Sequence, residues 1–302
     1  MDYVYSVTIL IGLFVILASS FNLIIGYGGL ISIAHPIFYG IGAYTSALLA
    51  RDAGLPVPLA MLGGVVLPTV LSVALSLPSL RISGDYLLIA SIGFQLGMIE
   101  LIKNLRFTGG ASGVSNIPAF LSPQFGKGAY VAFVVAVAIG VVLLVRRIAQ
   151  SDYGRAINAM RDDELAFAAL GRDAKWMKIS LFALGSGIAG FAGTHYAHYF
   201  RFVTVEQFEI LMSSTILTMV VVGGMRTPYG PVVGAVLLQA LPQAITFLNL
   251  PPSLLGPLQG LLFTGLVLIF MFVRPGGLIQ AGATWEAGKR AEAGARSKTG
   301  AR

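Results

Sequence analysis

RRIAQSDYGRAINAMRDDELAFAALGRDAKWMK, residues 146–178, is a charged segment in an otherwise apolar chain. It holds seven Lys/Arg and five Asp/Glu, which is 12 of the 33 charged residues of the sequence. Residues 129–145 before it and 179–200 after it contain no Asp, Glu, Lys or Arg. Because each flank is about as long as a membrane-spanning helix, we predict that this segment, the charged loop, faces water between two spans. Its mixed charge suggests a docking surface.

The rest of the composition is that of an integral membrane protein. Hydrophobic residues make up 56% of the chain and charged residues 11%, against roughly 25% charge in soluble domains. The longest charge-free runs, 3–50 and 227–273, each have room for two spans, since one span needs about 20 residues. The predicted fold class is all-α, a polytopic transmembrane bundle of about 8–10 helices. The expected spans lie near residues 3–25, 28–49, 57–79, 86–102, 129–145, 179–199, 210–225, 228–249 and 256–273.

Several of these spans are too rich in glycine and proline to be uniform helices. The interruptions fall at 26–29, 35–36, 40–42, 223–224 and 228–231. Non-helical backbone at membrane depth is tolerated where it is buried in protein or lines a cavity, so these segments are candidates for a translocation path. Short turns between tightly spaced hairpins are the alternative. Small residues four apart, as at Ser186/Gly190 and Ala189/Gly193, predict close helix packing.

The distribution of basic residues predicts the orientation in the membrane. Of the 20 Lys/Arg, 13 lie in the charged loop or after Val273, and basic loops stay on the cytoplasmic side. The N-terminus and residues 51–58, 103–128, 201–209 and 249–255 are then expected outside. We divide the chain into a membrane domain, residues 1–275, and a polar basic tail, residues 276–302, which is predicted to be cytoplasmic and disordered.

The sequence offers little for bond chemistry. It has no cysteine, and the patterns of a P-loop, HExxH and GxSxG are absent, so ATP cannot be bound through a P-loop of this chain. His195 and His198 could share a ligand, but no carboxylate lies in their span, which favours hydrogen-bonded roles. No metal site and no nucleic-acid partner is predicted. An intramembrane enzyme would need a set of reactive residues that the sequence does not show.

Two further features leave alternatives open. Glu100 is the only acid close to membrane depth, and either pairs with Lys103 three residues on or serves a proton relay. The expected external loop, residues 107–118, is rich in Gly, Ser and Thr. One interpretation is that it contacts a delivered solute or a binding protein, and the other is that it is a flexible surface loop.

Within the charged loop, two short helices are predicted. Asp152 is expected to cap the first, and Asp162 or Asp163 to cap the second, which would end at Gly171. The second carries the apolar residues of ELAFAALG, residues 164–171, which in water would favour a partner.

The chain resembles the permease subunits of branched-chain amino acid ABC importers, the LivM/LivH family, and most of all the LivM type. Its matching stretches include GRAINAMRDDELAFAALG (154–171), FTGGASGVSNIP (107–118) and VVVGGMRTPYGPVVGAVLL (220–238), with further matches at 22–49 and 187–198. The resemblance covers most of residues 20–275. It departs from the general importer pattern EAAxxxG, because Glu164 precedes Gly171 by seven residues and no Leu-Pro follows.

The resemblance implies a subunit of a bacterial inner-membrane importer that performs no bond chemistry and needs no cofactor. Its partners would be a second, LivH-like permease, two ATPase subunits that use the ATP, a periplasmic or lipid-anchored solute-binding protein, and membrane lipid. The charged loop would couple to the ATPase through Arg155, Arg161, Asp162, Asp163, Glu164 and Gly171. The solute path would be lined near Gly28, Ser32, His35, Gly40, Gly223 and Gly224.

Two alternatives stay open at this point. Similar permeases serve urea, short amides or aromatic acids, so the solute is not fixed. A secondary carrier or channel that works without ATP is the alternative class, although no chain of intramembrane acids of the kind that a proton-coupled carrier uses is visible.

Overall fold

The computed structural model describes residues 2–79, 85–120, 126–245 and scattered positions between 258 and 279. Six helices in these parts of the chain are long and apolar enough to cross a membrane, which confirms the predicted all-α polytopic fold. The elements in chain order are α1 (Asp2–Phe21), the π-helix η1 (Asn22–Tyr27), α2 (His35–Arg51), α3 (Val57–Ser79), α4 (Asp85–Asn104), η2 (Gly110–Ser112), β1 (Val114–Ser115), α5 (Gly126–Gln150), α6 (Asp152–Asp162), α7 (Glu164–Ala169), α8 (Ala174–Phe200), β2 (Phe202–Val203), η4 (Val205–Phe208), α9 (Ile210–Gly223) and α10 (Gly230–Ile245).

One of the predicted spans has a different outline, and two others lie partly or mostly outside the described residues. The span expected at 28–49 becomes helical only at His35, where α2 begins, because residues 28–34 are not helical. The span expected at 228–249 corresponds to α10, which begins at Gly230 and is described as far as Ile245. The span at 256–273 lies outside the described residues apart from isolated positions, and so does the predicted tail apart from Gly277–Ile279.

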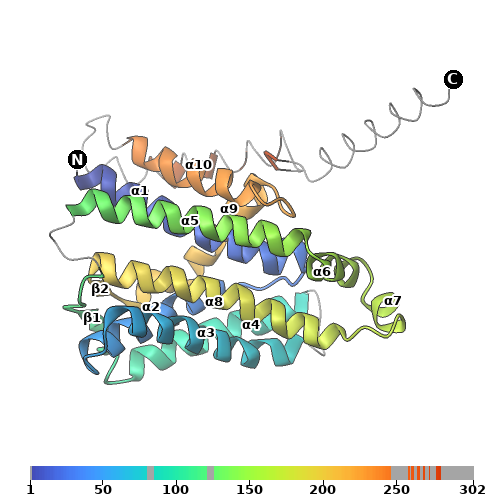
Figure 1. The fold of residues 1–302 in the computed structure, drawn as a ribbon, viewed down its shortest axis with the longest axis horizontal. Helices are drawn as coiled ribbons and strands as arrows, with labels where there is room; N and C mark the ends of the chain where they lie inside the picture. The colour runs from blue at the N-terminus through green and yellow to red at the C-terminus, as the bar shows by residue number, and fades with distance from the viewer. Residues whose placement is uncertain are drawn as a thin grey trace.

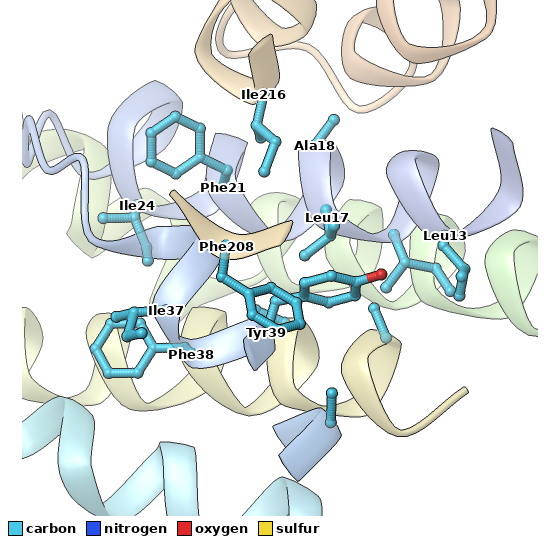
Figure 2. Close-up of a cluster of buried hydrophobic side chains, with 14 of the residues drawn as sticks. Leu13, Leu17, Ala18, Phe21, Ile24, Ile37, Phe38, Tyr39, Phe208 and Ile216 are labelled. Atoms are coloured by element: carbon cyan, nitrogen blue, oxygen red, sulfur yellow. The ribbon is translucent and has the colours of Figure 1, made fainter. Parts of the chain in front are cut away.

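Helix α1 lies at the centre of the bundle. Its apolar window is 83% buried, whereas the windows of α3, α4, α5 and α9 are 28–39% buried and leave long apolar faces for lipid or protein. Figure 2 shows side chains of α1, α2, η4 and α9 meeting in the core. There the rings of Tyr39 and Phe208 lie edge to face, 5.3 Å apart. Gly40 is glycine because a Cβ at that position would lie 2.8 Å from the Phe208 ring.

Helices α2, α3 and α8 pack with their backbones in close contact. A Cβ at Gly193 of α8 would lie 2.0 Å from the carbonyl oxygen of Tyr39 in α2. A Cβ at Gly42 of α2 would lie 2.3 Å from the carbonyl oxygen of Gly190 in α8. No side chain fits at either point, so the close packing predicted from the spacing of small residues is confirmed for α8.

The charged loop and the β1–β2 pair lie at opposite ends of the bundle. Figure 1 shows α6 and α7 beyond one end of the long helices and the two short strands at the other. The strands pair antiparallel, with Val114 opposite Val203 and Ser115 opposite Phe202, and so tie the segment after α4 to the turn after α8. This arrangement agrees with the prediction that both segments lie across the membrane from the charged loop. Which end faces the cytoplasm stays a prediction.

Candidate functional site: the junction of the charged loop with two interrupted helices

The first interruption is a segment that turns back into the bundle. The helical chain of α1 and η1 ends at Tyr27, and α2 begins at His35, whose Nε2 lies 2.8 Å from the hydroxyl of Ser20. Ser20 precedes Tyr27 by seven residues, or about 10 Å of helix at ~1.5 Å per residue. Residues 28–34 therefore run back roughly that distance alongside the end of the first helix before α2 starts. We call these seven residues the re-entrant segment.

Side chains of α4 and α9 bind both backbone groups of Ile33 in the re-entrant segment. Ile33 donates its N–H to the Ser91 hydroxyl at 2.9 Å. Its carbonyl oxygen lies 2.7 Å from the Ser213 hydroxyl, which is also 3.0 Å from Oε1 of Gln95. The Gln95 amide donates to the Phe208 carbonyl at 3.0 Å. This polar network lets non-helical backbone lie at membrane depth without unpaired groups at Ile33.

The second interruption separates α9 from α10. Helix α9 ends at Gly223, and Gly224 has φ +119°, a conformation that favours glycine. The carbonyl groups of Val222 and Gly223 accept hydrogen bonds from the N–H groups of Leu278 (2.8 Å) and Ile279 (3.0 Å). A later part of the chain thus completes the C-terminal end of α9.

A single buried amide joins the two interruptions. Asn22 lies in the π-helical turn that ends the first helix, and its Nδ2 donates to the carbonyl of Thr227 at 2.9 Å. Its Oδ1 accepts the N–H of Arg226 at 3.1 Å. Asn22 is fully buried, so these bonds fix the turn before α10 against the end of the first helix.

The charged loop contacts both interruptions through arginine. Arg161 of α6 donates a hydrogen bond to the carbonyl oxygen of Gly26. Its side chain also packs against Gly29, where an added Cβ would lie only 2.6 Å from Arg161 Cγ. Arg226, beyond α9, donates to Oδ1 of Asn158 at 3.3 Å and lies 3.7 Å from a carboxylate oxygen of Asp162. We call these contacts the junction.

Burial is the main influence on the Arg161 guanidinium, and it lowers the pKa of Arg161 below the ordinary value. Arg226 nearby acts in the same direction, and Asp162 opposes both. An arginine remains protonated in a protein, so the junction holds a partly buried positive charge. The Gly26 carbonyl, at the end of a helix, is a suitable acceptor for that charge.

The remaining predicted loop residues have other roles. Asp163 accepts the N–H of Ala166 at 2.9 Å and so caps α7, as one of the two predicted caps. Glu164 pairs with Lys178 at 2.7 Å. Arg155 pairs with Asp152 on the surface, and Gly171 has φ +78° with no atom within 4 Å of where a Cβ would lie. The predicted cap of α6 is wrong by one residue, because Ser151 accepts the N–H of Gly154 and Asp152 is already helical.

The apolar residues of α7 divide between two faces. Phe167 is buried in a small cluster with Ala156, Met160 and Ala174. Leu165 and Leu170 are 84% and 82% exposed, and Trp176 at the start of α8 is exposed as well. One face therefore holds α7 against α6 and α8, and the other is apolar and open to solvent.

The predicted path residues all lie at the two interruptions or in α2. The Ser32 hydroxyl accepts a hydrogen bond from the N–H of Ala34 at 3.3 Å, and the His35 ring is hydrogen-bonded to the Ser20 hydroxyl. Gly28 and Gly223 are packing positions, since a Cβ would lie 2.1 Å from Leu181 in one case and 2.0 Å from the Gly230 carbonyl in the other. Their role as lining of a path stays a prediction.

The predictions about polar residues in the spans have mixed outcomes, and the pairing of Glu100 with Lys103, one of two alternatives, is wrong. Glu100 does not pair with Lys103; it accepts a hydrogen bond from Asn104 at 2.7 Å, and Lys103 lies 3.8 Å from Glu209 of another element. The hydrogen-bonded role favoured for the two histidines is confirmed for His198. His198 binds Ser46 and the Pro118 carbonyl, whereas His195 lies among the rings of Phe120, Phe133 and Phe191.

The residues that join the interruptions were not predicted from the sequence. Asn22 is an amide in a charge-free run, and Arg226 is the only Lys or Arg between residues 202 and 273. Both signals were visible, because a polar group in an apolar span needs a partner. Gln95, Ser91 and Ser213 carry a weaker signal, since Ser is common in membrane helices.

Fold and junction together define a multi-span membrane protein with interrupted helices held by a loop outside the membrane. The family described as "Branched-chain amino acid transport system / permease component" matches residues 3–272. The chain therefore belongs to this permease family, as the resemblance indicated.

Individual relatives agree with this membership. The "High-affinity branched-chain amino acid transport system permease protein LivM" of Escherichia coli K12 is 30% identical over 294 residues, covering 88% of this chain and 68% of the relative. The protein of the same description from Salmonella typhimurium LT2 is 32% identical over 298 residues, with the same coverage of both chains. The "Probable branched-chain amino acid transport permease protein LivM" of Methanocaldococcus jannaschii is 26% identical, covering 92% of this chain and 93% of the relative. No solved structure matches the chain significantly.

Proposed function

We propose that this chain is the transmembrane permease subunit of an ATP-driven importer for branched-chain or other small amino acids. The family and the names of the relatives support the class of solute. The sequence has no P-loop, so the ATP would be hydrolysed on separate ATPase subunits.

The observation that carries the proposal is the junction. A loop that only connected two spans would need no bond to backbone at the interruptions, yet Arg161 binds the Gly26 carbonyl. Arg226 in turn binds Asn158 and lies close to Asp162. Movement of α6 would therefore displace both interruptions at once, which is what an importer driven from a cytoplasmic ATPase requires.

The ATPase would bind the exposed face of α7. Leu165 and Leu170 supply apolar area, and Phe167 on the other face anchors α7 to α6. Closure of two ATPase subunits would move α7 and α6 together. Arg161 and Arg226 would pass this movement to the re-entrant segment and to the turn before α10, and so switch the path between outward-open and inward-open states.

We also propose an orientation in the membrane, the partners and the course of the path. The charged loop, residues 146–178, and residues 276–302 would face the cytoplasm of a bacterial cell, with β1 and β2 outside. A solute-binding protein would deliver the amino acid at the β1–β2 end, and a second permease would complete the path. Residues 1–275 would form the membrane domain, and the path would pass the interruptions near Ser32, His35 and Gly224.

The test uses two exposed residues that no internal contact needs. In Leu165→Glu/Leu170→Glu, docking of the ATPase would bury two charges, which is unfavourable. The ATPase subunits should therefore no longer copurify, and uptake of labelled leucine by cells should be lost. The matched control is Leu165→Met/Leu170→Met, which keeps the apolar surface and should keep both properties. Normal ATPase copurification with the Glu variant would contradict the docking assignment. Leucine uptake that persists without any ATPase would contradict the importer itself.

A further inference from the structure

An apolar groove runs along the outside of the bundle between α1, α5 and α10. Its volume is about 340 Å³, and its walls include Ile11 and Val15, Ile139 and Val142, and Val232 and Val236. The one hydroxyl on the α1 wall, that of Thr8, already donates to the Val4 carbonyl at 2.8 Å. The groove therefore offers nothing to a polar ligand along most of its length.

A basic pocket of about 540 Å³ lies at the charged-loop end of the groove. Leu143 lines both spaces, so the apolar groove and the basic pocket lie next to each other. Arg146 and Arg147 line it together with Gln150 and Ser151, and no acidic residue does. Asp152, the next acid along the chain, pairs with Arg155. Two positive charges thus face a space that no carboxylate of the lining neutralises.

Tyr229 fixes one of these arginines at the boundary of the two spaces. Arg146 donates to the Tyr229 hydroxyl at 2.6 Å, and its guanidinium lies 5.6 Å from the centre of the same ring. Arg147 forms no hydrogen bond or ion pair with the described part of the chain, and its side chain is exposed. One arginine is held in place at the top of the groove and its neighbour is available.

The combined length of the groove and the basic pocket matches one leaflet of a membrane. Val135 is the wall residue of α5 farthest from the basic pocket, and twelve residues separate it from Arg147, or roughly 18 Å of helix. Half of a ~30 Å hydrocarbon core is about 15 Å. A ligand that placed an anionic group on the arginines could extend an apolar chain along the groove to the middle of the bilayer.

We propose that the groove and the basic pocket together bind one anionic phospholipid. The phosphate lies on Arg146 and Arg147, and one acyl chain lies between α1, α5 and α10. A free phosphate would leave the groove without an occupant, and a helix of another protein would bury two cations with no anion to pair them. The phospholipid satisfies the charge and the apolar wall with one molecule.

The position of this lipid gives it a mechanical role, a point that rests on the proposed function. Helix α5 continues into α6 at Ser151, and Tyr229 precedes α10 at the second interruption. A lipid held by Arg146, which itself binds Tyr229, would therefore link the start of the charged loop to the second interruption, and its loss would loosen both.

The test measures lipid binding directly and does not depend on transport. The full chain, with the subunits that copurify, is placed in phosphatidylcholine nanodiscs containing spin-labelled phosphatidylglycerol or spin-labelled phosphatidylcholine. An immobilised spectral component is expected for phosphatidylglycerol. Arg146→Gln/Arg147→Gln should weaken the binding about tenfold or more, the loss expected for two basic contacts. Arg172→Gln/Lys175→Gln removes two exposed positive charges elsewhere in the charged loop and should leave binding unchanged.

A second pair of variants tests the groove itself. Ile139→Trp places a large ring on the exposed wall of the groove and should reduce the immobilised component, whereas Leu144→Trp, also exposed on α5 but outside the groove, should not. Equal immobilisation of both lipids would overturn the proposal, as would unchanged phosphatidylglycerol binding in the arginine variant. The proposal would also be overturned if the arginine variant kept its lipid and instead lost a protein that copurifies with the wild type. Lipid binding that follows the prediction while the wild-type protein takes up no leucine would contradict only the proposed function.

Discussion

The side-chain carbonyl of Asn22 accepts the backbone N–H of Arg226 at 3.1 Å, although 204 positions separate the two residues in the chain. The same amide donates to Thr227 at 2.9 Å. One side chain thus uses both of its polar ends to hold the turn before α10 against the π-helical end of the first helix, and arginine side chains link the charged loop to both.

Asn22→Leu tests this link. Leucine has a similar volume but leaves the N–H of Arg226 and the carbonyl of Thr227 without these partners, at a cost of about 1–3 kcal/mol for each buried group. We expect a large drop in the melting temperature of the detergent-purified protein. Asn104→Leu, at an exposed position, should shift it little. Equal melting temperatures for Asn22→Leu and the wild type would show that the two turns do not depend on this amide.

Arg161→Gln tests coupling separately from stability. It removes a charged hydrogen bond to Gly26, worth about 1.5–3 kcal/mol, so the loop should move without displacing the re-entrant segment. Uptake of labelled leucine should fall roughly tenfold or more, the change in an equilibrium that 1.4 kcal/mol produces. ATPase copurification should persist, because Arg161 points toward the bundle. The surface variant Arg172→Gln serves as control, and loss of ATPase binding in Arg161→Gln would contradict the assignment.

Gly29→Ala tests the fit of Arg161 against the first interruption. Alanine at φ +66° costs about 1–2 kcal/mol, and its methyl group would also lie 2.6 Å from Arg161 Cγ. Gly54→Ala has the same backbone cost at φ +65° with no atom within 4 Å. The difference in melting temperature between the two variants measures the steric contact alone. A smaller destabilisation by Gly29→Ala than by Gly54→Ala would mean that Arg161 does not fill this space.

Ser213→Ala tests the polar network around Ile33. It leaves the Ile33 carbonyl and Gln95 without the hydroxyl between them, and should destabilise the protein by about 1–3 kcal/mol. Ser214→Ala, one residue on, removes only a hydroxyl bonded within its own helix and should be nearly neutral. Thermal unfolding monitored by tryptophan fluorescence compares the two. Identical curves would indicate that the re-entrant segment draws no stability from α9.

The class of fold could be predicted because it depends on composition and spacing. Charge-free runs of membrane length gave the helices, and the spacing of small residues at Ala189/Gly193 gave the close packing of α8. The charged loop was placed correctly between two spans, and Asp163 acts as one of its predicted caps.

The contacts of the junction could not be predicted from the sequence. Arg161 was assigned to the docking surface, and no pattern along the chain indicates that its side chain turns toward Gly26. Glu100 and Lys103 have the spacing of a helical pair, but the neighbouring Glu209 and Asn104 offer competing partners. Local spacing determines which residues can meet, whereas the packing of distant elements determines which do meet.

The hydrogen bonds from Leu278 and Ile279 to the end of α9 also set an order of assembly. During synthesis, Asn22, Arg161 and Arg226 have all left the ribosome before residues 278 and 279 appear. The contacts of the charged loop with both interruptions can therefore form first, and the end of α9 is completed only when this late segment arrives. A nascent chain stalled before that point would hold an unfinished α9, with two carbonyl groups exposed to whatever quality-control machinery surveys the membrane.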